Sequence, residues 1–70
     1  MSHPQYSHIG ALDDKVIEEC SELIKAICKA KRFGIDDFHP AKLTTNRMQI
    51  LAEMKDVEER IAAYRKEIEL

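Results

Sequence analysis

The sequence predicts an all-α protein, a two-helix antiparallel hairpin that oligomerises into a four-helix-type bundle. The chain has 70 residues with only two glycines and two prolines, too few for the many turns of a β-sandwich. Apolar residues recur at helical spacing through two long segments. Two helices do not cover apolar stripes of this width, and a core of this size is marginal, so association with a second copy is expected.

The chain is expected to form one domain, residues 1–70, with four segments in order. These are a flexible arm, a first helix, a connection and a second helix, at residues 1–11, 12–33, 34–44 and 45–69. Asp13 and Asp14 complement the helix dipole at the start of the first helix. Gly34 suits the position that ends this helix.

The second helix is expected to begin at a capping residue, which is Thr44, Thr45 or Asn46. Asn46 and Gln49 have the spacing of a capping box. Apolar residues then recur along this helix at alternating spacings of four and three residues, at Ile50, Met54, Val57, Ile61, Tyr64 and Ile68. The first helix has a similar seam at Val16, Cys20, Leu23, Ile27 and Ala30. Such seams predict helix-on-helix packing, and hence a homo-oligomer, either a dimer or a tetramer.

The connection is expected to contain no β-strand. Phe33, Phe38 and Tyr6 are expected to fill a core around it. Asp36 and His39 are expected to be solvated.

Charge, hydropathy and cysteine use exclude several classes of protein. Eleven basic and 13 acidic residues give a net charge of -2, whereas a general nucleic-acid binder is normally basic. No apolar run approaches the roughly 18 residues that span a membrane. Cys20 and Cys28 lie too far apart on one helix for a disulfide, so two buried thiols in a cytoplasmic protein are expected, the alternative being a disulfide from either cysteine to another chain. The chain has no glycine-rich phosphate loop, no zinc-ligand spacing and no Glu-x-x-His motif.

Acidic residues occupy matching positions on the two predicted helices. Glu19 and Glu22 are three residues apart on the first helix, and Glu53 and Asp56 are three apart on the second. Viewed down each helix axis, the two pairs lie at the same angles from the apolar seam. Antiparallel packing of the helices would therefore bring all four carboxylates together in the space between them. Oxygen ligands select Mg²⁺ or Mn²⁺, and such an ion clamps phosphate oxygens, which indicates hydrolysis at a phosphate. A solvated acidic face, with Asp56 paired to Arg60, is the alternative.

Basic and polar residues near the connection are candidate substrate contacts. Lys29, seven residues after Glu22, shares its helix face and could meet a phosphate. Arg32 and Arg47 flank the connection and could do the same. Asn46 could bond a base or sugar. The alternatives are a basic cluster that complements the helix C-terminus, for Lys29 and Arg32, and an N-cap for Asn46.

Several segments occur in an order that resembles one known family. They are Val16–Leu23, Lys29–Gly34, Thr45–Arg47 and Glu53–Val57, with Glu-Glu-x-x-Glu followed by Glu-x-x-Asp. Over roughly residues 12–60 the chain resembles the MazG-like all-α nucleoside triphosphate pyrophosphohydrolases. The resemblance implies Mg²⁺-dependent cleavage of a (d)NTP to a nucleoside monophosphate and pyrophosphate.

The resemblance also implies roles for individual residues. The implied Mg²⁺ ligands are Glu19, Glu22, Glu53 and Asp56. Glu18 and Glu19 are implied as catalytic residues, with Glu18 assisting water activation. The apolar seams leave a second function open, that of a catalytically inactive helical oligomerisation or regulatory module on the same scaffold.

Overall fold

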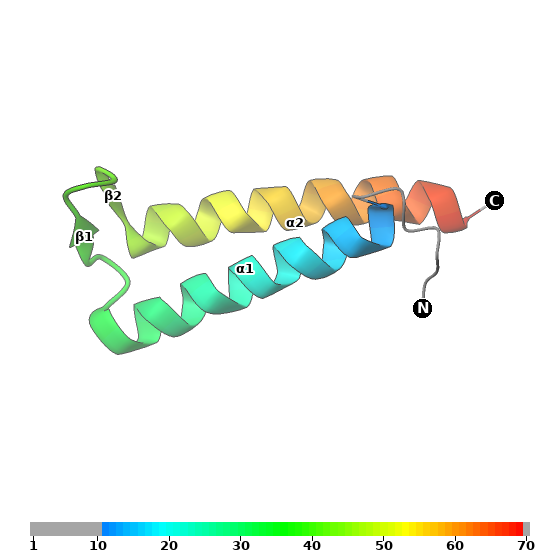
Figure 1. Cartoon of the computed structure of the whole chain (residues 1–70). Helices are drawn as coiled ribbons and strands as arrows, with labels where there is room; N and C mark the ends of the chain where they lie inside the picture. The colour runs from blue at the N-terminus through cyan, green and yellow to red at the C-terminus, as the bar shows by residue number, and fades with distance from the viewer. Residues whose placement is uncertain (1–10, 70) are drawn as a thin grey trace.

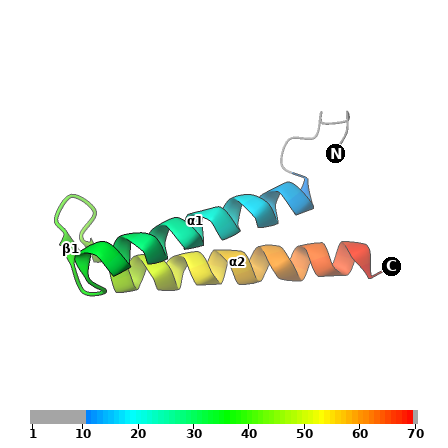
Figure 2. The ribbon, with the colours of Figure 1, turned by 90° about the horizontal axis from the view of Figure 1, so that it is seen from below.

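The computed structural model describes residues 11–69 and consists of two antiparallel helices joined at one end (Figure 1). In chain order the elements are α1 (Leu12–Phe33), β1 (Phe38–His39), β2 (Thr44–Thr45) and α2 (Asn46–Ile68). The helices lie side by side in both views (Figure 2), and the mostly helical character agrees with the all-α prediction. The helix α1 has the expected bounds, and α2 is one residue shorter at each end than expected. Tyr6 and the predicted arm, apart from Ala11, lie outside the described residues.

Charges and a glycine define the two ends of α1. Asp13 and Asp14 lie in its first turn, and Lys31 and Arg32 lie in its last turn, where each sign complements the helix dipole. Gly34 follows the last turn and donates its backbone N–H to the carbonyl of Ala30 at 2.8 Å. Its φ of 105° lies in the region that favours glycine. The expected helix stop at Gly34 is therefore confirmed.

Thr45 caps α2, which decides among the three expected capping residues. Its Oγ1 accepts a hydrogen bond from the backbone N–H of Met48 at 3.1 Å. The expected capping box of Asn46 and Gln49 is wrong, because Asn46 is already the first residue of the helix and its side chain turns to the connection. The Gln49 amide instead lies 3.5 Å from the hydroxyl of Thr44.

The connection contains a two-stranded antiparallel pair, so the expectation of no strand is wrong. Phe38 lies opposite Thr45, and His39 lies opposite Thr44. A turn joins the strands, and in it the backbone N–H of Leu43 donates to the His39 carbonyl at 2.7 Å. Leu43 has a φ of 56°, which is uncommon for a residue other than glycine. Strands of two residues are too short to show the alternation from which a strand is predicted.

Asn46 links both ends of the connection and is the most buried residue described, with 1% of its surface exposed. Its Nδ2 donates to the Gly34 carbonyl at 2.8 Å, and its Oδ1 lies 2.7 Å from Nε2 of His39. Because a carboxamide oxygen only accepts, the His39 ring donates through Nε2. His39 is therefore not simply solvated, and Asp36 forms an ion pair with Arg47. The expected solvation is therefore wrong for His39, whereas Asp36 keeps 68% of its side-chain surface exposed, as expected.

The two helices leave most of their large apolar side chains exposed. Among the described residues the buried apolar side chains are Ile50 and Val57. The exposed ones are Ile17, Ile24, Ile27, Phe33, Ile35, Phe38, Leu43, Met48, Leu51, Met54, Ile61 and Ile68. Phe33 and Phe38 therefore do not fill a core around the connection, because one helix pair has too little surface to enclose them.

Two further sequence expectations concern the thiols and the membrane. Cys20 is half-buried and Cys28 is exposed, and both are free. The expectation of two buried thiols is therefore wrong for Cys28. Across residues 11–69, neither helix has the length and apolar character that crossing a membrane requires.

Candidate functional site

Three carboxylates from the two helices converge near the middle of the hairpin. Glu19 comes from α1, whereas Glu53 and Asp56 come from α2. One oxygen of each lies within 4.8 Å of the others. Glu53 and Asp56 share a helix face because they are three residues apart, and antiparallel packing brings Glu19 opposite them. The structure therefore brings together three of the four predicted metal ligands.

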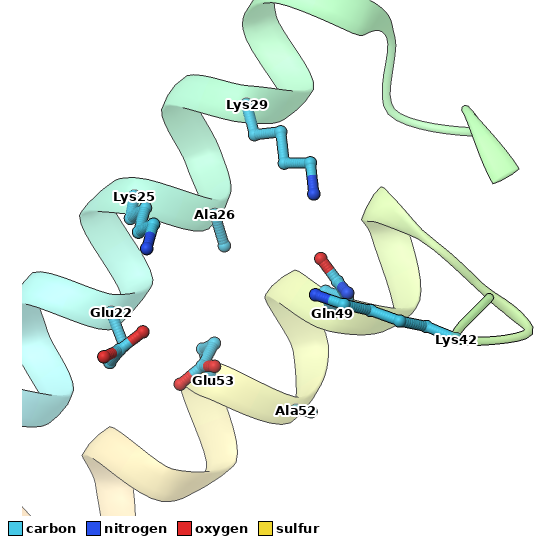
Figure 3. Close-up of a pocket in the computed structure, with 8 residues that line it drawn as sticks. All are labelled: Glu22, Lys25, Ala26, Lys29, Lys42, Gln49, Ala52 and Glu53. Atoms are coloured by element: carbon cyan, nitrogen blue, oxygen red, sulfur yellow. The ribbon is translucent and has the colours of Figure 1, made fainter. Parts of the chain in front are cut away.

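Glu22, the fourth predicted ligand, lies one turn from Glu19 toward the connection. It lines a pocket together with Glu53, across the gap between the helices (Figure 3). Glu22 is exposed, whereas Glu19 and Glu53 are half-buried. The two predicted acidic pairs thus meet along one side of the hairpin.

The electrostatics of Glu53 show how closely these acids interact. Burial raises the pKa of the Glu53 carboxyl, and the negative charges of Asp56, Glu19 and Glu22 raise this pKa further. Loss of hydration and like charges both disfavour the ionised form. Among residues 11–69 the one ion pair joins Arg47 to Asp36, away from this cluster. Clustered oxygen donors without a paired cation fit a hard divalent ion such as Mg²⁺ or Mn²⁺.

Glu18 does not join this cluster. Its side chain is exposed, and the residue neither belongs to the converging carboxylates nor lines the pocket. Its backbone carbonyl accepts a hydrogen bond from the hydroxyl of Ser21 at 2.9 Å. The geometry therefore gives no support to the predicted catalytic role of Glu18.

A pocket of about 210 Å³ lies next to the carboxylates, between the helices and the connection (Figure 3). It is lined by Glu22, Lys25, Ala26, Lys29, Lys42, Gln49, Ala52 and Glu53. Of the four predicted substrate contacts, Lys29 is in this pocket. Sequence reasoning missed Lys25, although its spacing of three residues from Glu22 was a usable signal. It also missed Lys42, whose position depends on the path of the connection.

The other three predicted substrate contacts are engaged elsewhere. The Arg32 guanidinium lies over the ring of Phe33, 5.4 Å from its centroid. Arg47 donates to both carboxylate oxygens of Asp36, at 2.9 Å and 3.2 Å. The amide of Asn46 is buried and has partners within the chain on both of its polar atoms. None of the three lines the pocket, so we leave them out of the site.

Comparison with known proteins does not assign the chain to a family. No family model matches it, and neither does any curated protein or solved structure. A functional assignment therefore depends on the side chains and their geometry.

Proposed function

We propose that the chain is a Mg²⁺-dependent nucleoside triphosphate pyrophosphohydrolase, which cleaves a (d)NTP to a nucleoside monophosphate and pyrophosphate. One observation carries this proposal. Carboxylates from both helices converge beside a pocket lined by lysines. Clustered oxygen ligands suit Mg²⁺, and adjacent ammonium groups suit the phosphates that such an ion binds. This combination agrees with the resemblance to the MazG-like enzymes.

The residues divide into two groups by their chemistry. Glu19, Glu53 and Asp56 would hold Mg²⁺, or Mn²⁺ in its place, and Glu22 would complete the set from the next turn of α1. When bound, the ion polarises phosphate oxygens and lowers the pKa of a coordinated water. Lys29 contributes positive charge beside the carboxylates, where it attracts the phosphates. Assistance by Glu18 in water activation remains a prediction from the resemblance.

Assembly with a second copy of the chain is part of this proposal. Ile17 and Ile24 are seven residues apart on α1, hence on one face, and are 66% and 62% exposed. Leu51 on α2 is 59% exposed. One chain buries too little apolar surface for a stable core, so we expect a dimer or tetramer. Sedimentation of a stable, helical monomer at micromolar concentration would overturn this part.

A cytoplasmic location also belongs to the proposal. Cys20 and Cys28 are free thiols, and free thiols fit a reducing compartment.

The test of the activity is pyrophosphate release from canonical and modified (d)NTPs, with and without Mg²⁺. We expect Glu53→Gln and Asp56→Asn to abolish release, because each removes a charged oxygen from the cluster. Glu58→Gln and Glu59→Gln are matched controls, since both side chains are exposed on α2 and lie outside the cluster and the pocket. Release by Glu53→Gln and Asp56→Asn at the level of these controls would place the metal elsewhere and refute the assignment.

A second function is favoured by the exposed apolar faces. A catalytically inactive oligomerisation or regulatory module would have the same helices and the same seam. Calorimetric titration with Mg²⁺ separates the two functions, because an inactive scaffold has no reason to bind the ion specifically. Saturable Mg²⁺ binding that is lost in Asp56→Asn supports the enzyme.

A further inference from the structure

An exposed stripe of side chains runs along one side of α1, and we call it the outer stripe. Its members recur at alternating spacings of three and four residues, and they are Asp14, Ile17, Ser21, Ile24, Cys28 and Lys31. All six are exposed, and Ile17 and Ile24 expose 66% and 62% of their surfaces. Residues at this spacing share one side of a helix, so a second helix could cover the whole stripe.

The outer stripe lies on the side of α1 away from the carboxylates. Measured from the half-buried Leu23 at about 100° per residue, Ile17 and Ile24 lie about 120° and 100° to one side. Glu19 and Glu22 lie about 40° and 100° to the other side. A partner that covers the outer stripe therefore leaves the carboxylates accessible.

The middle of the outer stripe is complementary to itself when two copies lie antiparallel. If a two-fold axis passes midway between Ser21 and Ile24, each of these residues faces the other one in the second copy. By the same symmetry, Ile17 faces Cys28 of the second copy. The Ser21 hydroxyl donates to carbonyls of its own helix, at 2.9 Å and 3.2 Å, so its burial would leave no unpaired hydroxyl. The contact can therefore be apolar and closely packed along its centre.

The charged ends of the outer stripe favour the antiparallel direction. In the same register, Asp14 in the first turn of α1 faces Lys31 in the last turn of the second copy, and the symmetry repeats this pair. Two parallel copies in register would instead place like charges opposite each other. Within residues 11–69 the one ion pair joins Arg47 to Asp36, so Asp14 and Lys31 form no ion pair inside that part of the chain. Charge complementarity thus indicates a second copy as the partner of this surface.

We propose that two copies of the chain associate through the outer stripes of antiparallel α1 helices, with Ile17 of each copy against Cys28 of the other. The stripe drifts by about 20° per seven residues, which fits the crossing angle of about 20° common in helix bundles. This inference deepens the assembly that is part of the proposed function, because it gives the face, the direction and the register of the contact. The carboxylates of each copy then lie away from the contact.

The first test is disulfide formation between full chains in oxidised glutathione, followed by electrophoresis without reductant. Every variant carries Cys20→Ala, which removes the half-buried thiol. Adding Ile17→Cys should give a covalent dimer, because facing residues of packed helices come within reach of a disulfide.

Two controls keep one thiol of this pair each. Cys20→Ala alone retains Cys28, and the triple variant Cys20→Ala, Ile17→Cys, Cys28→Ala retains the thiol at position 17. Neither should form a covalent dimer, because positions 17 and 28 are 11 residues apart. In this register that separation places identical thiols about 16 Å apart along the helix axis. A covalent dimer through Cys28 alone would overturn the register, and no covalent dimer with Ile17→Cys would overturn the interface.

The second test is the dimer dissociation constant of Ile24→Lys, measured by sedimentation. A lysine at the centre of the contact should raise this constant by about tenfold or more, because its charge would be buried without a partner. Ile68→Lys is the matched control, since Ile68 is also 62% exposed but lies at the end of α2. It should stay within about twofold of wild type. Equal weakening by the two variants would overturn the interface, and circular dichroism checks that both keep their helices.

The interface and the proposed activity fail in different ways. If the covalent dimer forms as expected but no (d)NTP releases pyrophosphate, the interface stands and the enzyme assignment fails. If pyrophosphate is released and Ile17→Cys forms no covalent dimer, the enzyme assignment stands and the interface fails.

Discussion

The pKa of a carboxyl group shifts in opposite directions in the connection and in the space between the helices. In the connection, hydrogen bonds from Arg47 lower the pKa of Asp36, and the positive charge of Arg47 adds to this effect. Between the helices, burial and three neighbouring acids raise the pKa of Glu53. Ionisation therefore stabilises the folded state at Asp36 and destabilises it at Glu53.

The opposite pKa shifts distinguish side chains that stabilise the fold by pairing within the chain from carboxylates that are placed to bind a ligand. Asn46, His39 and Asp36 all have hydrogen-bond partners in the connection or in the first turn of α2. Glu19, Glu53 and Asp56 face one another without a cation. A repulsive cluster costs folding free energy unless an ion is bound, which is the behaviour expected of a metal site.

Removing the Asn46 side chain should have the largest effect. Asn46→Ala leaves the Gly34 carbonyl and the His39 ring without their partners. Both hydrogen bonds are partly buried and each contributes about 0.5–1.5 kcal/mol, and removal of the buried amide also leaves a cavity, so we expect the free energy of unfolding to fall by about 2–4 kcal/mol. Urea unfolding followed by circular dichroism measures this loss.

Met48→Ala is the control for this prediction. Met48 lies in the same helical turn but is 51% exposed, so its loss should change stability by less than about 0.5 kcal/mol. If Asn46→Ala costs no more than Met48→Ala, the connection is not what holds the two helices together.

Adding Mg²⁺ should have the next largest effect, because it relieves the repulsion between the helices. A ligand that binds only the folded state at a hundredfold excess over its Kd adds about 2.7 kcal/mol to the free energy of unfolding. We expect the Tm to rise in Mg²⁺ and to return to its original value in EDTA. Asp56→Asn should lose this response, and Asp36→Asn, in the connection, should keep it. An unchanged Tm in millimolar Mg²⁺ would show that the carboxylates do not form a metal site.

Glu53→Gln should change how stability depends on pH in the metal-free protein. The pKa of Glu53 is raised above its ordinary value of 4.5, so between these two pKa values the folded state binds the proton more tightly than the unfolded chain. The stability that Glu53 contributes is present below pH 4.5 and is lost as the pH rises through its folded pKa. Relative to Glu53→Gln, wild type should become less stable as the pH increases. Thermal unfolding in EDTA across this range measures the difference, and Glu58→Gln should follow wild type.

Helical spacing made α1 and the converging acids predictable from the sequence. The backbone of a helix determines that Glu53 and Asp56 share a face whatever else surrounds them. Their approach to Glu19 then required only that the helices pack antiparallel. For the same reason Lys29 was predicted on the face of Glu22 and is found in the same pocket.

The connection was not predictable, because its interactions join residues that no local pattern relates. Asn46 bonds to Gly34, 12 positions away, and to His39, seven positions away. These approaches depend on the turn at Leu43, whose positive φ is uncommon for leucine. Lys42 reaches the pocket through the same turn, so the sequence offered no sign of its position.

The smallest effect is expected from Asp36→Asn, and it should have the opposite dependence on pH to that of Glu53. Arg47 lowers the pKa of Asp36 below its ordinary value of 3.8, so the stability from this pair is present above pH 3.8 and is lost as the pH falls through the folded pKa. Both side chains are more than half exposed, so water and salt screen the pair and the effect is small. Wild type should exceed Asp36→Asn in Tm near neutral pH, and the two should converge in acid or in molar salt. If the difference instead grows as the pH falls, Asp36 and Glu53 respond to ionisation in the same way, and the contrast between the connection and the helices is lost.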